Sequence, residues 1–163
     1  MPINKGETSY FMDLSEDLED IPQSKQKKAL KEAGEVARES ILDYTSKRNS
    51  PVSKGEYEKK LSARYREEKK RMGKGGVANL RLKEKMLNSL RVGTRGNGFR
   101  VYIHGNSKKN LAKSHGHNSG GYGFDKEGPK RQFLPDDSTG EKFKPNIRRK
   151  IKETLEKYKR KKR

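Results

Sequence analysis

The chain has 163 residues, of which 28% are apolar and 39% are charged, and its net charge is +19. This length fits one domain, and so few apolar residues build only a thin core unless burial is completed inside an assembly. The sequence has no cysteine and no run of about 18 apolar residues, which excludes disulfides, thiol chemistry and a transmembrane helix. A charge this large implies a polyanionic neighbour, most often nucleic acid.

Residues 1–22 form an acidic block, opposite in charge to the rest of the chain. Tyr10, Phe11 and Leu14 lie among its carboxylates at roughly helical spacing. Two interpretations stay open: a disordered acidic tail, or an arm that lays these three side chains on a neighbouring subunit. The block lacks the basic and apolar stretches of a secretory signal, so we expect the chain to be used in the cytoplasm or in a particle assembled there.

Two helices are expected next. From Ser24 to Tyr44, apolar residues recur every three or four positions and give one apolar stripe. The sequence Asn49-Ser50-Pro51 interrupts this pattern, because proline disfavours helical geometry at the residue before it. A second helical pattern covers about residues 54–72, and the Gly-rich residues 73–76 end it.

A short third helix over residues 82–90 leads into the clearest strand signal of the chain. The apolar period changes to two over residues 91–103, on both sides of the turn sequence Gly96-Asn97-Gly98. This pattern predicts a β-hairpin. Residues 105 to about 130 are rich in Gly, Asn, Ser and Lys, and they predict a long loop.

A closing helix is expected to begin at Pro145, because proline suits the first turn of a helix and apolar residues follow at helical spacing. The fold class is therefore α+β, with about four helices around a small, mostly antiparallel sheet that includes the hairpin. Residues 1–22 form the acidic N-terminal arm, and residues 23–163 form one domain that ends in a basic tail.

No catalytic residue, cofactor or metal site is expected. His115 and His117 are two residues apart and have no carboxylate at ligand spacing, so they make a poor zinc site. The Gly-rich segments lack the Walker pattern of a phosphate loop. Between charged and Pro-containing turns lies the apolar pair Phe133-Leu134, which we expect to be buried at a subunit interface or under the closing helix.

The C-terminal tail is the strongest electrostatic feature of the sequence. The six basic residues expected to contact a polyanion are Lys157, Lys159, Arg160, Lys161, Lys162 and Arg163. One or two cations complement the dipole of a helix C-terminus, and this run exceeds that need. We expect sequence-independent contact with DNA or with an acidic protein surface, because no recognition motif is present.

The order of these features resembles a family of tailed phages, the virion-morphogenesis and tail-completion (neck) proteins. The resemblance covers roughly residues 26–158 and is carried by their order and spacing. Its pieces are SPVSKGEYEKKLSARYREEKKR from Ser50, NLRLKEKMLNSLRV, a GNG hairpin, HGHNSGG, PKRQFLPDD and a final amphipathic helix. The chain departs from the family at Lys83-Glu84, where Thr-Gly is usual, and at Gln132, where proline is frequent.

The resemblance implies a non-enzymatic virion subunit that forms a homo-oligomeric ring, sixfold, in the neck. Its partners would be the head-side connector, the tail proteins and packaged DNA, with no membrane involved. The alternative from another class is a sequence-independent nucleic-acid-binding protein, such as a ribosome-associated factor. The acidic block and the lack of an RNA-binding motif weigh against that alternative.

Overall fold

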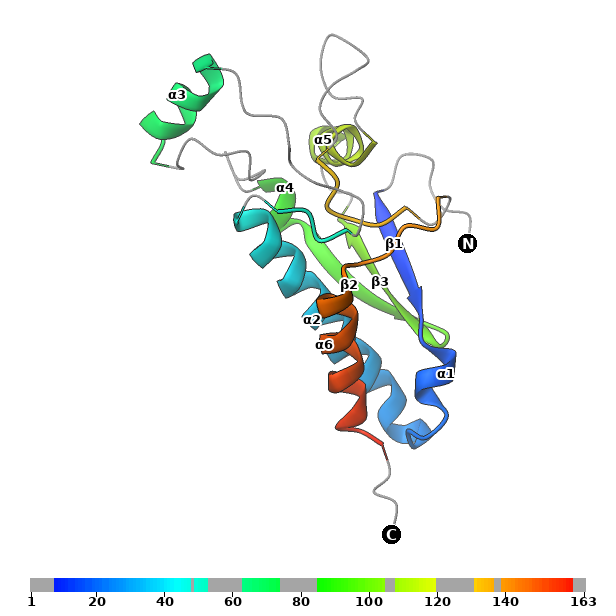
Figure 1. Ribbon diagram of the computed structural model, residues 1–163. Helices are drawn as coiled ribbons and strands as arrows, with labels where there is room; N and C mark the ends of the chain where they lie inside the picture. Colours follow the sequence, from blue (N-terminus) through cyan, green and yellow to red (C-terminus); the bar gives the residue numbers. More distant parts are fainter. Residues whose placement is uncertain are drawn as a thin grey trace.

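The structure is a computed structural model, and it describes residues 8–47, 49–52, 63–73, 85–104, 108–119, 131–136 and 139–159. Its helices and strands follow one another along the chain as shown in Figure 1. In order they are β1 (Ser9–Asp13), α1 (Ser15–Leu18), α2 (Gln23–Ser46), α3 (Ala63–Arg71), α4 (Lys85–Asn88), β2 (Leu90–Arg95), β3 (Gly98–Ile103), α5 (Lys108–Ser119) and α6 (Pro145–Glu156).

The three strands form one antiparallel sheet in the order β1-β3-β2. The predicted hairpin is confirmed: β2 and β3 pair with Leu90 opposite Ile103, and Gly96 takes the positive φ of 52° that the tight turn requires. On β1, Tyr10 pairs with Val101 of the central strand. The predicted α+β class is confirmed, and the described residues contain six helical segments, two of them only four residues long.

Helices α2 and α6 pack beside each other and cover one face of the sheet, as Figure 1 shows. Gly34 brings α2 close to the strands: a Cβ there would collide with Val92 of β2 and press on the ring of Phe99 of β3. From α6, Ile147 and Ile151 join the same core and are at most 1% exposed. The apolar stripe expected between Ser24 and Tyr44 and the closing helix expected at Pro145 are both confirmed.

The described part of the acidic block, residues 8–22, is folded into the domain. The prediction of a separate arm is wrong there, because β1 is hydrogen-bonded to β3 along its whole length. Tyr10 and Leu14 are 8% and 2% exposed and belong to the core of their own chain, so they are not available as anchors on a neighbour. Phe11 points to the opposite face of the sheet, and 36% of it is exposed.

The prediction of a long loop from residue 105 to about 130 is wrong over residues 108–119, which form α5. Among the side chains given for this helix, only Leu111 is a large apolar residue packed against the core. The helix therefore shows only a weak apolar period in the sequence. Tertiary hydrogen bonds compensate: the buried hydroxyls of Thr8 and Ser114 lie 2.7 Å apart. Residues 105–107 and 120–130 lie outside the described part.

The two middle helices can be compared with the prediction only in their described parts. In the expected helix over residues 54–72, the structure describes residues 63–71 as α3, and residues 53–62 are not described. The helix expected over residues 82–90 is α4, which ends at Asn88. Leu90 instead begins β2, because pairing with Ile103 buries it completely.

Candidate functional site

Phe133 and Leu134 are buried as predicted, each 0% exposed. They lie in the core cluster that contains Ile147 and Ile151 of the closing helix. Their backbone N–H groups both donate to the side-chain oxygen Oδ1 of Asn118, at 3.1 and 3.0 Å. Asn118 lies near the C-terminal end of α5, so one carboxamide joins this helix to the apolar pair. The pair is therefore an anchor within its own chain.

The segment before α3 holds the same apolar pair from another direction. Ser50 donates from its hydroxyl to the carbonyl of Gln132 at 2.7 Å and accepts from the backbone N–H of Val52 at 3.1 Å. Val52 in turn forms a β-bridge with Phe143, just before α6. We call this set of contacts the junction; its residues are Ser50, Val52, Asn118, Gln132, Phe133, Leu134 and Phe143.

The side chain of Gln132 makes hydrogen bonds inside the junction. Its side-chain N–H donates to the carbonyl of Leu134 at 3.0 Å and to the carboxylate of Glu141. Gln132 is 1% exposed.

Basic groups gather beside the junction. The carbonyl of His117 on α5 accepts from the backbone N–H of Arg131 at 2.8 Å. Burial, with Arg131 and Lys113 nearby, lowers the pKa of His117 to about 4, so its imidazole is neutral at pH 7. Lys69 on α3 is 2% exposed, and burial together with Arg131 lowers its pKa as well. The described residues contain no group of three or more His, Cys, Asp or Glu side chains placed to hold a metal ion.

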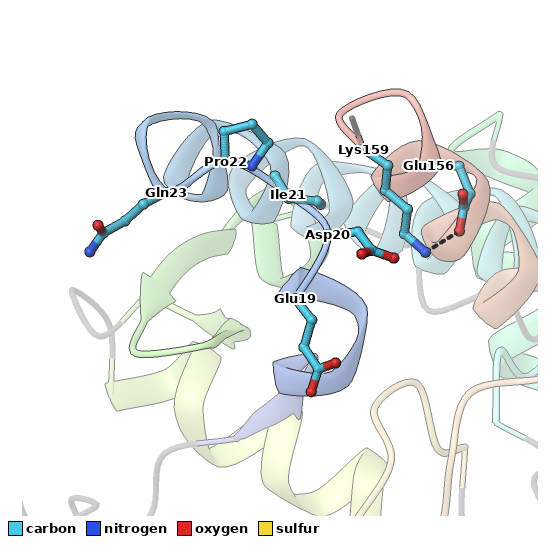
Figure 2. Close-up of a pocket in the computed structure, with 7 residues that line it drawn as sticks. All are labelled: Glu19, Asp20, Ile21, Pro22, Gln23, Glu156 and Lys159. Carbon is cyan, nitrogen blue, oxygen red and sulfur yellow. Dashed lines mark ion pairs between the residues drawn. The ribbon is translucent and has the colours of Figure 1, made fainter. Parts of the chain in front are cut away.

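The basic tail begins at a charged cleft of about 540 Å³ between α1, the start of α2 and the end of α6. Figure 2 shows the side chains of Asp20, Glu156 and Lys159 turned toward one another there. The amine of Lys159 lies 2.6 Å from a carboxylate oxygen of Glu156. Its hydrogen bond to Glu156 is the main cause that raises the pKa of Lys159, with smaller contributions from Asp20 and Asp17.

Two further contacts fix the end of α6 to the rest of the fold. The side chain of Tyr158 is hydrogen-bonded to Glu32 on α2, and this bond is the main reason why the pKa of Tyr158 is raised. Lys152 lies 3.9 Å from Asp17 on α1. Asp17 and Asp20 of the N-terminal block thus face basic residues of their own chain, whereas the arm expected from the sequence would have placed the acids on the surface of a neighbour.

The structure separates the predicted site residues into three groups. Phe133, Leu134, Tyr10 and Leu14 are in the core, and Phe11 is on the opposite face of the sheet, 36% exposed. Lys157 is exposed, and Lys159 is engaged with Glu156. Arg160, Lys161, Lys162 and Arg163 lie outside the described residues.

Sequence reasoning missed the polar members of both sites. In the sequence, Asn118 and Ser50 cannot be told from ordinary loop residues. Their hydrogen-bond partners are 15 and 82 positions away, and a local pattern does not reveal them. For the site of Asp20 and Glu156 the sequence does carry a signal. The chain has an acidic N-terminal block and a basic C-terminal end, and opposite charges favour contact between these two segments.

Comparisons with protein-family profiles, with curated protein sequences and with solved structures find no match for this chain. In the described part, no helix has both the length and the apolar character needed to cross a membrane. The fold and the site define a small α+β domain with a three-stranded antiparallel sheet, a buried junction of distant segments and a charged C-terminal cleft.

Phe133→Ala should lower the free energy of unfolding by about 3–5 kcal/mol, because it leaves a cavity in a fully buried part of the core. Phe11→Ala is the matched control, and its loss should be clearly smaller since Phe11 is 36% exposed. Urea unfolding followed by circular dichroism measures both. Equal losses for the two variants would contradict the assignment of Phe133 as the anchor.

Folding stability should fall as the pH drops from about 6.5 to about 4, because of His117. Over that window the unfolded chain binds a proton on this imidazole that the folded chain does not, so acid favours unfolding. The lost stability is about 3 kcal/mol for the full shift. His117→Gln should flatten this part of the pH profile.

Glu156→Gln should strengthen binding of the chain to duplex DNA at low salt, by a factor of about two to five, the range of an exposed ion pair. The substitution removes the carboxylate that holds Lys159, so this cation becomes available to phosphate. Glu39→Gln makes the same charge change at an exposed position near the other end of α2. Fluorescence anisotropy measures both, and equal gains would show a general charge effect without release of Lys159.

Proposed function

We propose that this chain is a non-enzymatic structural subunit of a tailed-phage neck, which joins the head connector to the tail. In this role, identical subunits form a ring, expected to be sixfold, and their surfaces meet the connector on one side and the tail on the other. The charge of the chain then serves contact with packaged DNA or with acidic neighbouring proteins.

The junction is the observation that carries the proposal. The motifs behind the family resemblance are far apart in the sequence: Ser50 opens one, Asn118 lies in another, and Phe133-Leu134 is the centre of a third. In the fold Ser50 donates to the carbonyl of Gln132 and Asn118 accepts from Phe133 and Leu134, so two motifs are hydrogen-bonded to the third over distances of 2.7–3.1 Å. Short motifs that occur by chance have no reason to converge in this way, whereas those of one structural family do.

The sheet supports a role in an oligomer. In the described part of the chain, β1 and β2 each pair with another strand on one side only. An open strand edge is a template for pairing with a neighbouring chain. Because the two edges differ, contact between them is heterologous, and heterologous contacts with a suitable rotation close into a ring.

A second candidate function is sequence-independent binding of nucleic acid outside a virion. The observation that favours it is the presence of three arginines, Arg91, Arg95 and Arg100, on the sheet face opposite α2. The location of the protein separates the two functions: a neck subunit is found in the particle, and a host-type factor is found on cellular nucleic acid.

An early stop codon in the gene should yield DNA-filled heads and unattached tails in place of complete phage particles. A synonymous change at the same codon is the matched control and should leave particle yield unchanged. Electron microscopy of the lysates counts the joined and unjoined particles, and expression of the chain in trans should restore joining. A normal yield of infectious particles from the stop mutant would contradict the proposal.

A further inference from the structure

The face of the sheet turned away from α2 carries arginine and aromatic side chains together. Residues alternate between the two faces of a strand, and cross-strand partners share a face. Because α2 packs on Val92 and Phe99, the neighbours of these residues along the strands lie on the other side. We call that side the outer face; its residues are Ser9, Phe11, Asp13, Arg91, Gly93, Arg95, Gly98, Arg100 and Tyr102.

Planar groups lie next to one another on the outer face. Phe11 pairs across the sheet with Arg100, and its ring reaches over Gly98, where any side chain would collide with it. The guanidinium of Arg100 stacks on Tyr102, 4.8 Å from the ring centroid. The exposed Phe11 ring and the Arg100–Tyr102 stack thus form two adjacent flat surfaces on a rigid support.

The charge of the outer face is mostly positive. Arg91 and Arg95 are exposed, and Asp13 is the face's only carboxylate among the described residues. Arg91 is already oriented, because its Nη1 donates to the carbonyls of Asn88 and Leu90 at 2.8 and 2.9 Å. A guanidinium keeps further N–H donors when one nitrogen is engaged in this way, so it can still bind phosphate.

We propose that the outer face binds single-stranded nucleic acid, with bases stacked on Phe11 and on the Arg100–Tyr102 pair and with phosphates at Arg91 and Arg95. Unpaired bases stack on aromatic rings and guanidinium planes, and neighbouring cations bind the phosphates that link those bases. Duplex DNA hides its base faces and would make no use of Phe11. The site is separate from the basic tail, and it does not depend on the neck assignment.

The stacking of bases on Phe11 can be tested with a fluorescein-labelled oligothymidylate. Its binding to the full chain is measured by anisotropy across a range of salt concentrations. Phe11→Leu keeps an apolar side chain but removes the ring, and it should weaken binding roughly 5- to 100-fold without changing the salt dependence. Phe11→Tyr should retain the affinity of the original chain. Thermal melting of each variant establishes that the fold is intact.

The charge part needs a second pair of variants. Arg91→Gln/Arg95→Gln should weaken binding and reduce the slope of log affinity against log salt by about 0.7 for each phosphate that is no longer bound on a single strand. Lys31→Gln/Lys142→Gln changes the charge equally at exposed positions elsewhere and should have a much smaller effect on affinity and slope.

Three outcomes would overturn the proposal. One is an affinity of Phe11→Leu equal to that of the original chain. Another is equal weakening by the two double variants, which would leave only general charge attraction. The third is loss of self-association or of partner protein binding in folded Phe11→Leu with no change in oligonucleotide affinity, which would make the outer face a protein interface.

Discussion

The close approach of α2 to the sheet at Gly34 determines where the other elements lie. Without a side chain at this position, the helix rests directly on Val92 and Phe99, and a Cβ would force the two layers apart. Gly34 lowers the intrinsic stability of the helix by about 1 kcal/mol relative to alanine. The cost is offset by burial of the small residues around it, including Ala33 and Ala37, which are 0% exposed. Helix α6 then fills the space beside α2 and completes the cover of this face.

A chain with 28% apolar residues has little left for the second face of the sheet. Its large buried side chains are gathered in one cluster, to which the sheet, α2, α6 and the apolar pair at Phe133 contribute. The segments around this cluster are joined by side-chain hydrogen bonds to backbone groups, as at Asn118 and Ser50. Each such bond satisfies a backbone group in the interior, so these polar residues stabilise the fold although they are not apolar.

The elements that could be predicted from the sequence are those whose pattern is local. Helix α2, the hairpin and α6 each show a clear apolar period and a recognisable break, and the burial of Phe133 and Leu134 followed from their charged surroundings. Strand β1 could not be predicted, because Ser9–Asp13 is short, lies among acids, and pairs with a strand about 90 positions later. Helix α5 was missed for a similar reason: Gly, Asn and Ser favour loops locally, and the hydrogen bonds that hold it connect distant residues.

The charged groups of the two candidate surfaces meet at one end of the molecule. Gln23, in the first turn of α2, lines the acidic cleft beside Lys159 and also a second cleft that Lys27 and Arg95 border. Arg95 of the outer face and Lys159 at the start of the tail therefore lie at clefts that share Gln23, and Figure 2 shows Asp20 and Glu156 beside Lys159. Ion pairs at the surface, such as that of Lys159 with Glu156, contribute little stability and are screened by salt. A polyanion reaching this end competes for Lys159 at little cost, so the acids orient the beginning of the tail without neutralising it.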